Sequence, residues 1–251
     1  MEVLFLDAPY SGTVELSNDT LTYLKKKKYT TVGLYASVQF VNQLDTVRTQ
    51  LAKAGIIIIS SKADRTHVTG QILGCDNYHN SLHLDAQQES AIDCYLYIGD
   101  GKFHPLALVY AQKDKTEMKE IICNDPLQHK MILVGIQDIK TILKKYRGSL
   151  IKFLSATTIG VIVTIKPGQE QFRPALLLET KFPDKKFYYF IDNVISFDQL
   201  ENFNFIEVWV NTSCPRVGFD DQEKFRRGVI NLNDAFLANE ILSKESVLNR
   251  L

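Results

Sequence analysis

Short runs of β-branched and aromatic residues alternate with stretches of helical spacing along this chain, and this alternation limits its fold more than any other feature. Strands are predicted at 3–6, 31–35, 56–60, 94–98, 107–111, 120–123, 158–165, 187–191 and 206–210. Helices are predicted at 16–27, 41–54, 128–154 and 197–202, with another starting at 172–178 and a helix or tail at 234–251. Strands separated by helices indicate parallel sheets with crossover helices, and the isoleucine run at 56–60 is expected to be buried on both faces.

The alternation restarts after the long helix, which predicts two domains in the 251 residues. We place the boundary near residue 150, with domains at 31–150 and 151–251 after a leading segment at 1–30. The echo between Thr31-Val32-Gly33-Leu34 and Thr158-Ile159-Gly160-Val161 suggests that the domains are duplicates. The expected class is α/β, with two consecutive flavodoxin/Rossmann-like units, each a small parallel sheet with flanking helices.

Composition excludes several classes of protein. The 29 acidic and 29 basic residues balance, so no overall field attracts the chain to nucleic acid or membrane. The run Lys25–Lys28 is interpreted as a solvated helix end, with phosphate or RNA contact as the alternative. No apolar run reaches the roughly 18–20 residues of a membrane span. With no signal-peptide pattern and four cysteines, a cytoplasmic protein with reduced thiols is expected.

Two of the cysteines sit in turns that favour close approach to a ligand. Gly74 lets the backbone before Cys75 approach without a Cβ, and Pro215 stiffens the turn after Cys214. Ligands of open parallel sheets bind outside the carboxyl ends of strands, and thiolates suit iron–sulfur clusters and zinc. Cys94, inside an apolar strand, is predicted to be a small buried hydrophobe, and Cys123 to be somewhat more exposed.

Other chemistries find less support in the sequence. It has neither a P-loop nor a dinucleotide-binding glycine pattern, and no nucleophile elbow. His79 and His83 have the spacing of one helix face but no third metal ligand nearby, so a surface pair is predicted. A cysteine-dependent hydrolase that pairs Cys75 or Cys214 with His104 stays open.

Four motifs in order carry a resemblance to a known family. They are Gly70-Gln71-Ile72-Leu73-Gly74-Cys75, Tyr97-Ile98-Gly99-Asp100-Gly101-Lys102-Phe103-His104-Pro105-Leu106, Thr164-Ile165-Lys166-Pro167-Gly168-Gln169, and Asn211-Thr212-Ser213-Cys214-Pro215-Arg216-Val217-Gly218-Phe219-Asp220-Asp221. Together they resemble the archaeal and eukaryotic 2-(3-amino-3-carboxypropyl)histidine synthases, which begin diphthamide biosynthesis.

The resemblance implies a fold and a reaction. Members of the family have three similar α/β domains, each of which gives one cysteine to a central [4Fe–4S] cluster. S-adenosyl-L-methionine binds the open iron, and cleavage of its Cγ–S bond gives a 3-amino-3-carboxypropyl radical. The radical adds to a histidine ring of translation elongation factor 2.

Carried over by motif, Cys75 matches the second-domain ligand and Cys214 the third-domain ligand. Loops that would wall the S-adenosylmethionine site contain Phe103, His104, Lys166, Gly168, Gln169 and Arg216. From its chemistry, the Arg216 guanidinium suits the methionine carboxylate, and Asp220 or Asp221 could pair with the ammonium group.

The sequence departs from the family pattern because the first domain and its cysteine are missing, and residues 1–30 look like the tail of that domain. The third ligand could come from a separate first-domain polypeptide, a longer sister subunit or another copy in a homodimer, unless the chain is an excised fragment. The main hypothesis is a subunit of the transferase acting on elongation factor 2, without direct nucleic-acid or membrane contact. The alternative is a non-catalytic scaffold that docks a sister subunit or elongation factor 2.

Overall fold

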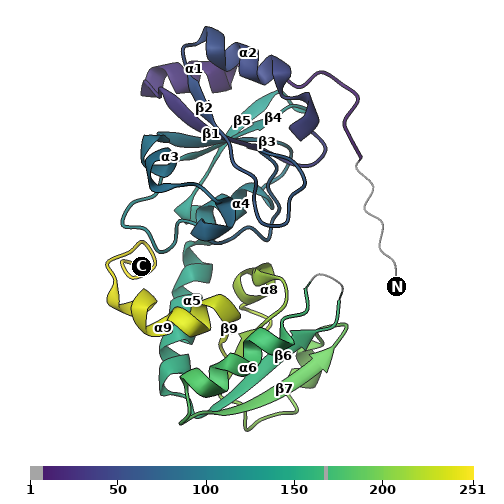
Figure 1. The fold of residues 1–251 in the computed structure, drawn as a ribbon, viewed down its shortest axis with the longest axis vertical. Coiled ribbons are helices and arrows are strands. Elements are labelled where there is room, and N and C mark those ends of the chain that lie inside the picture. The colour runs from purple at the N-terminus through teal and green to yellow at the C-terminus, as the bar shows by residue number, and fades with distance from the viewer. Residues whose placement is uncertain (1–7, 167–168) are drawn as a thin grey trace. The chain divides into compact units, whose positions relative to one another are not determined.

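The computed structural model describes residues 8–166 and 169–251, and the chain divides into two compact units (Figure 1). Unit 1 comprises Met1–Lys113 with Glu117–Asp138, and unit 2 comprises Asp114–Thr116 with Ile139–Leu251. The predicted strand at 3–6 and the predicted site residue Gly168 lie outside the described residues. Over the part that is described, no helix combines the length and apolar character that a membrane crossing needs.

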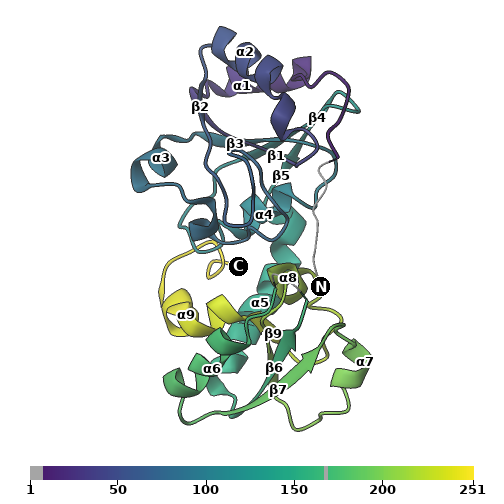
Figure 2. The same cartoon turned by 45° about the vertical axis from the view of Figure 1, so that its right-hand side comes forward.

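Unit 1 is built on a five-stranded sheet of order β2-β1-β3-β4-β5. Its strands are β1 (Thr31–Ala36), β2 (Ile57–Ile59), β3 (Cys94–Ile98), β4 (Ile121–Asp125) and β5 (Lys130–Val134). Its helices are α1 (Asn18–Lys27), the 3₁₀ helices η1 (Val41–Gln43) and η2 (His79–Leu82), α2 (Asp45–Lys53), α3 (Ala86–Ala91) and α4 (Pro105–Tyr110). In both side views α1 and α2 lie on one side of this sheet and α3 and α4 on the other (Figure 1 and Figure 2).

Unit 2 is built on a four-stranded sheet of order β7-β6-β8-β9, in which every pair is parallel. Its strands are β6 (Thr158–Thr164), β7 (Lys186–Asp192), β8 (Val208–Asn211) and β9 (Val229–Asn231). Its helices are α6 (Phe172–Lys181), α7 (Phe197–Leu200), α8 (Pro215–Asp220) and α9 (Leu232–Ser243), and α5 (Ile136–Ser155) enters it from unit 1. The α/β class and the two-sheet organisation are therefore as predicted.

The prediction that each unit has a wholly parallel sheet is wrong for unit 1. Its first four strands are parallel, but β5 pairs antiparallel with β4. The predicted helix at 128–154 begins only at Ile136, because residues 130–134 form this hairpin strand instead. The strand order 2-1-3-4-5 matches that of flavodoxin-like sheets, which differ in being parallel throughout.

Two further element predictions are corrected. The run predicted as a strand at 107–111 lies almost wholly in α4, which begins at Pro105, a residue suited to the first helical turn. The isoleucine strand β2 is an edge strand rather than a buried one, and Ile57 is 63% exposed. The strand β9 and the short helices α3 and α8 were not predicted.

The segment before β1 is part of the structure of unit 1. Leu24 of α1 is fully buried in the main hydrophobic cluster, together with Val14 and Leu16. Ser17 caps α1, and the buried Asn124 Oδ1 accepts hydrogen bonds from Ser17 N and Thr20 Oγ1, both at 2.8 Å. These contacts join α1 to the end of β4.

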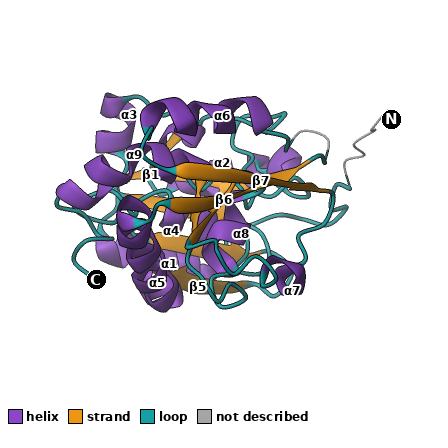
Figure 3. Ribbon diagram, turned by 90° about the horizontal axis from the view of Figure 1, so that it is seen from below, coloured by secondary structure: helices purple, strands orange, loops and turns teal. Residues whose placement is uncertain are grey.

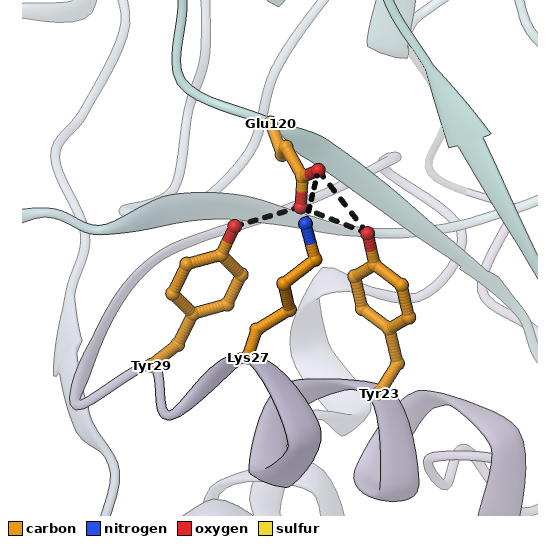
Figure 4. A network of polar contacts seen from close by, with 4 residues as sticks. All are labelled: Tyr23, Lys27, Tyr29 and Glu120. Carbon is orange, nitrogen blue, oxygen red and sulfur yellow. Dashed lines mark hydrogen bonds and ion pairs between the residues drawn. The ribbon is translucent and has the colours of Figure 1, made fainter.

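A second set of contacts joins the other end of α1 to the start of β4 (Figure 4). The Glu120 carboxylate accepts hydrogen bonds from Tyr23 Oη at 3.0 Å and Tyr29 Oη at 2.7 Å, and Lys27 Nζ lies 2.9 Å away. Burial is the largest influence on the pKa of Glu120 and would raise it, but the combined hydrogen bonds from Lys27 and the two tyrosines hold the pKa below its usual value. The charge of Lys27, in the last turn of α1, is therefore partly neutralised by Glu120.

In both units a carboxylate accepts hydrogen bonds from the backbone at the start of one strand, which is β1 in unit 1 and β6 in unit 2. In unit 1, Asp93 Oδ2 accepts hydrogen bonds from Thr30 N at 2.7 Å and Thr31 N at 2.9 Å. In unit 2, Glu207 Oε2 accepts from Thr157 N at 2.8 Å and Thr158 N at 2.7 Å. Asp93 directly precedes β3, which neighbours β1, and Glu207 directly precedes β8, which neighbours β6. We call this arrangement the carboxylate bracket, and its repetition supports the predicted duplication.

The bracket of unit 2 gives a pH-dependent prediction. Hydrogen bonds from Thr158 and Thr157 lower the pKa of Glu207 from 4.5 to about 2 in the folded chain. Its stabilising effect is therefore complete above about pH 4.5 and is lost as the pH falls toward 2. Because the group is partly exposed, we expect Glu207→Gln to lower the free energy of unfolding by only about 1 kcal/mol at neutral pH.

Urea unfolding followed by the fluorescence of Trp209, the only tryptophan of the chain, measures this effect within unit 2. The difference between the wild-type chain and Glu207→Gln should shrink as the pH falls from 4.5 toward 2. A difference that is constant over this range would contradict the role of the bracket.

Candidate functional site

Each sheet has one point where the chain leaves neighbouring strands in opposite directions, and ligands of open α/β sheets bind at such points. In unit 1 this point lies between β1 and β3, and in unit 2 between β6 and β8. The turn that contains Cys214 follows β8, and the loop that contains Cys75 follows β2 in the chain but pairs with the end of β1. We call them the Cys75 half-site and the Cys214 half-site, and each is described within its own unit.

The Cys75 half-site is fixed to the carboxyl end of β1. Ala36 N donates to Gly70 O at 2.7 Å, and Ile72 N donates to Ala36 O at 3.0 Å, so the loop continues the sheet for one bridge. Beyond it, Leu73 N donates to the buried Asp76 Oδ2 at 2.8 Å. These bonds hold the backbone on both sides of the half-buried Cys75 thiol.

Gly74 is required by a close approach in this half-site. A Cβ at Gly74 would lie 2.1 Å from Cε1 of Phe103, so the aromatic ring covers the glycine directly. Phe103 is 53% exposed and meets His104 edge to face at 5.4 Å, and His104 stacks on Tyr97 at 6.5 Å. The structure therefore brings Phe103 beside the Cys75 turn, with His104 next to it. That both residues line a ligand site stays a prediction.

Three buried polar side chains at this end of unit 1 have no hydrogen-bond partner among the described residues. They are the Ser37 hydroxyl, directly after β1, the Tyr97 hydroxyl on β3, and both amide atoms of Asn77. Asn77 and Tyr97 are fully buried. Unpaired buried polar groups are costly and are typical of sites that receive water or a ligand. Sequence reasoning missed all three, although Ser37 follows a strand end and Asn77 follows the Cys75 turn.

The Cys214 half-site is held by a network of buried asparagines. Thr212 N and Oγ1 donate to Ile162 O at 3.0 and 2.9 Å, which fixes the turn to β6. Asn211 Nδ2 donates to Cys214 O at 3.0 Å and to Asn231 Oδ1 at 2.8 Å. Cys214 is half-buried and directly precedes α8, with Pro215 in the first turn of that helix.

The other predicted residues of unit 2 lie near the same strand ends. Lys166 is exposed just after β6, the strand beside β8, and Gln169 N donates to Lys166 O at 3.1 Å. Arg216 is 5% exposed, and its guanidinium pairs with Asp220 at 2.5 Å. Asp221 pairs with Lys224 at 2.9 Å. A ligand carboxylate bound to Arg216 would therefore share that guanidinium with Asp220.

The four thiols fall into two chemical classes. Cys94 and Cys123 lie inside strands and are almost wholly buried, and burial raises the pKa of each to about 12. The prediction for Cys94 is confirmed, and the prediction that Cys123 is more exposed is wrong. Cys75 and Cys214 are half-exposed and form no disulfide, which suits thiolate ligands. In the described part of the chain, no group of three His, Cys, Asp or Glu side chains could hold a metal ion.

The histidine pair predicted from its spacing lies in and beside the short helix η2. His79 pairs with Glu89 at 3.1 Å, and His83 pairs with Asp64 at 2.5 Å. Each ring therefore has its own carboxylate partner, as expected for surface residues.

Comparison with known proteins gives consistent matches. The model of the diphthamide synthesis protein family matches residues 2–247. The 2-(3-amino-3-carboxypropyl)histidine synthase of Pyrococcus horikoshii is 28% identical over 197 residues, which cover 77% of this chain and 53% of that protein. Subunit 1 of the corresponding enzyme of Schizosaccharomyces pombe is 24% identical and covers 75% of this chain and 42% of its own length.

The fold matches as well. The crystal structure of Dph2 from Pyrococcus horikoshii with a 4Fe–4S cluster superposes with a TM-score of 0.69 at 25% identity, covering 91% of this chain and 62% of that one. This chain therefore spans about half the length of the curated relatives that it matches.

Proposed function

Because the chain belongs to the diphthamide synthesis protein family, we propose that it is a subunit of the enzyme that transfers a 3-amino-3-carboxypropyl group from S-adenosyl-L-methionine to a histidine of elongation factor 2. The observation that carries the proposal is the placement of the two half-exposed cysteines. Each lies at the ligand-binding end of its own sheet, in a chain whose fold resembles a protein with a 4Fe–4S cluster.

The residues present fit part of a cluster site. Cys75 and Cys214 would hold a [4Fe–4S] cluster as thiolates, and the absence of a side chain at Gly74 lets Phe103 pack directly beside Cys75. When bound, the cluster supplies the electron that cleaves a C–S bond of S-adenosylmethionine. A third thiolate would come from a separate first-domain polypeptide, a longer sister subunit or a second copy of the chain.

The protein residues would bind and orient the substrate. Phe103 and His104 would offer aromatic faces beside Cys75, and the unpaired Asn77, Ser37 and Tyr97 supply neutral donors and acceptors behind them. In unit 2 the loops that would wall the site contain Lys166, Gly168, Gln169, Arg216, Asp220 and Asp221. The Arg216–Asp220 pair would position Arg216 for the methionine carboxylate, with Asp221 or Asp220 near the ammonium group. The proposed setting is the cytoplasm, with elongation factor 2 as protein substrate.

A second candidate is an accessory subunit that docks a catalytic sister subunit or elongation factor 2. It is favoured by the two candidate thiolates among the described residues, where a cluster with one open iron needs three. In that case the cysteines would be dispensable.

One transfer assay distinguishes the two candidate functions. The chain is co-purified with the family member that supplies the remaining thiolate and reconstituted anaerobically with iron and sulfide. It is then mixed with elongation factor 2, labelled S-adenosylmethionine and dithionite, the one-electron reductant that the cluster needs. We expect label on a histidine of elongation factor 2, and no label when Cys75 and Cys214 are both replaced by alanine. Full labelling by that double variant, with the sister protein still bound, would establish the accessory role instead. No labelling even by the wild-type pair would argue against the proposed activity.

A further inference from the structure

Unit 2 has one blocked and one open sheet edge. The edge strand β9 is buried along its whole length, and α8 and α9 pack on it. The opposite edge is β7, with α6 along one face, and no described strand pairs with its outer side (Figure 3). β7 has seven residues, five of them apolar or aromatic, and neither a proline nor a bulge protects it. Tyr188 is 40% and Ile191 54% exposed, and such edges pair readily with another strand.

The hydrogen bonds to β6 determine which residues face outward. Lys186 N donates to Thr157 O at 2.7 Å, and Asp192 O accepts from Ile165 N at 3.4 Å. In a parallel strand the N–H and C=O of one residue point to the same side, and successive residues alternate. The even-numbered residues therefore bond to β6. The backbone groups of Phe187, Tyr189 and Ile191 point to the open edge.

The sequence of this strand is complementary to itself when it is reversed. If two copies of Lys186–Asp192 run antiparallel about Tyr189, each Lys186 lies opposite Asp192 of the other copy, at both ends of the ladder. Tyr188 lies opposite Phe190, and Phe187 opposite Ile191. The outward residues Phe187, Tyr189 and Ile191 then form the hydrogen-bonded pairs that an antiparallel ladder needs. Opposite charges and facing aromatic residues are both favourable cross-strand pairs.

We propose that two copies of this chain associate through β7, in antiparallel register about Tyr189, and join their two four-stranded sheets into one. We infer a second copy as the partner because the charges, the apolar residues and the outward hydrogen-bonding groups of β7 are all complementary to those of an antiparallel β7. Val194, two residues beyond the end of β7 and 65% exposed, extends the apolar character of this edge. The open edge β5 lacks this match, because reversal about Ile132 places Lys130 opposite Val134. The inference does not depend on the proposed function.

A disulfide trap tests the register. Residues in a hydrogen-bonded antiparallel pair have Cα atoms about 5.5 Å apart, which suits a disulfide. Tyr189→Cys should therefore form a covalent dimer on mild oxidation, with the 189–189 bond identified by peptide mapping. Tyr188→Cys is the matched control, since its symmetry mate lies on a diagonal roughly 7–8 Å away, beyond easy bridging. Equal cross-linking of both variants, or of neither, would overturn the proposed register.

A charge exchange tests the same interface without a cysteine. Under reducing conditions, sedimentation of the wild-type chain should show a monomer–dimer equilibrium. Lys186→Asp should raise the dimer dissociation constant about tenfold or more, because symmetry places the like charges in the interface twice. The double variant Lys186→Asp/Asp192→Lys should restore association. A wild-type chain that stays monomeric, or a dimer indifferent to the single substitution, would rule out pairing through β7.

Discussion

Serine in place of Cys214 is expected to abolish iron–sulfur loading of the assembled enzyme. The oxygen of serine is a poor ligand for this soft-ligand site, and removal of one thiolate leaves too few protein ligands for a [4Fe–4S] cluster with one open iron. The Asn211 network keeps the turn in place without the thiol, because its contacts are with backbone and asparagine atoms. The folded chain should therefore remain, while brown colour and bound iron are lost. Cys75→Ser is expected to behave in the same way.

Iron analysis and visible absorption after anaerobic reconstitution measure this loss. Cys123→Ala is the matched control, because Cys123 is buried in β4 with its pKa raised to about 12 and cannot reach a ligand. It should load iron as the wild-type chain does. Equal loading by wild-type, Cys214→Ser and Cys123→Ala would show that Cys214 is not a ligand.

Alanine in place of Gly160 is expected to destabilise unit 2 by about 3 kcal/mol, near the upper end of the usual cost of overpacking. A Cβ at this position would lie 2.3 Å from two ring carbons of Trp209 and 3.0 Å from Ile206. Trp209 is 2% exposed and packs on Phe190 with ring centroids 5.0 Å apart. Because the ring is buried and packs on Phe190, it could move away from an added methyl group only by disturbing that contact.

Gly148→Ala provides the contrast in the same unit. Gly148 lies within the helix α5, and an added Cβ would meet nothing within 4 Å. Because alanine favours helix more than glycine does, this variant should gain about 0.5–1 kcal/mol. Urea unfolding followed by Trp209 fluorescence compares both variants with the wild-type chain. A Gly160→Ala variant as stable as the wild type would show that the strand tolerates a side chain here.

The buried strands of the two sheets could be predicted from the sequence because their residue patterns are typical of such strands. β1, β3, β6 and β8 are buried along almost their whole length, so their sequences are continuous apolar runs bounded by polar turns. The same signal failed for 107–111, since a short helix buried on all sides reads like a buried strand. β5 was missed because it lies directly before the long helix, and its lysine and four apolar residues were assigned to the first turns of that helix.

The candidate site was predictable only in part. Turn chemistry marked Cys75 and Cys214, and the motifs marked Phe103 and His104 as neighbours of one site. The buried, unpaired side chain of Asn77 depends on packing between segments distant in sequence, which no local pattern encodes. The ion pair of Arg216 with Asp220 is different, because its i,i+4 spacing within α8 is visible in the sequence. The convergence of the two thiols on one cluster stays a prediction, which the iron-loading experiment addresses.

The carboxylate bracket offers a way to trace the ancestry of the fold. Asp93 and Glu207 accept the same pair of backbone hydrogen bonds in two segments whose sequences otherwise share little. The bracket is therefore retained where most of the sequence similarity is not. The fingerprint of one ancestral module is an acidic residue just before one strand, such as β3 or β8. Its carboxylate accepts hydrogen bonds from two consecutive backbone N–H groups at the start of the adjacent strand, such as β1 or β6. We expect the same fingerprint in the region of the longer relatives that this chain does not cover, and its presence there would make those relatives triplications of a single gene segment.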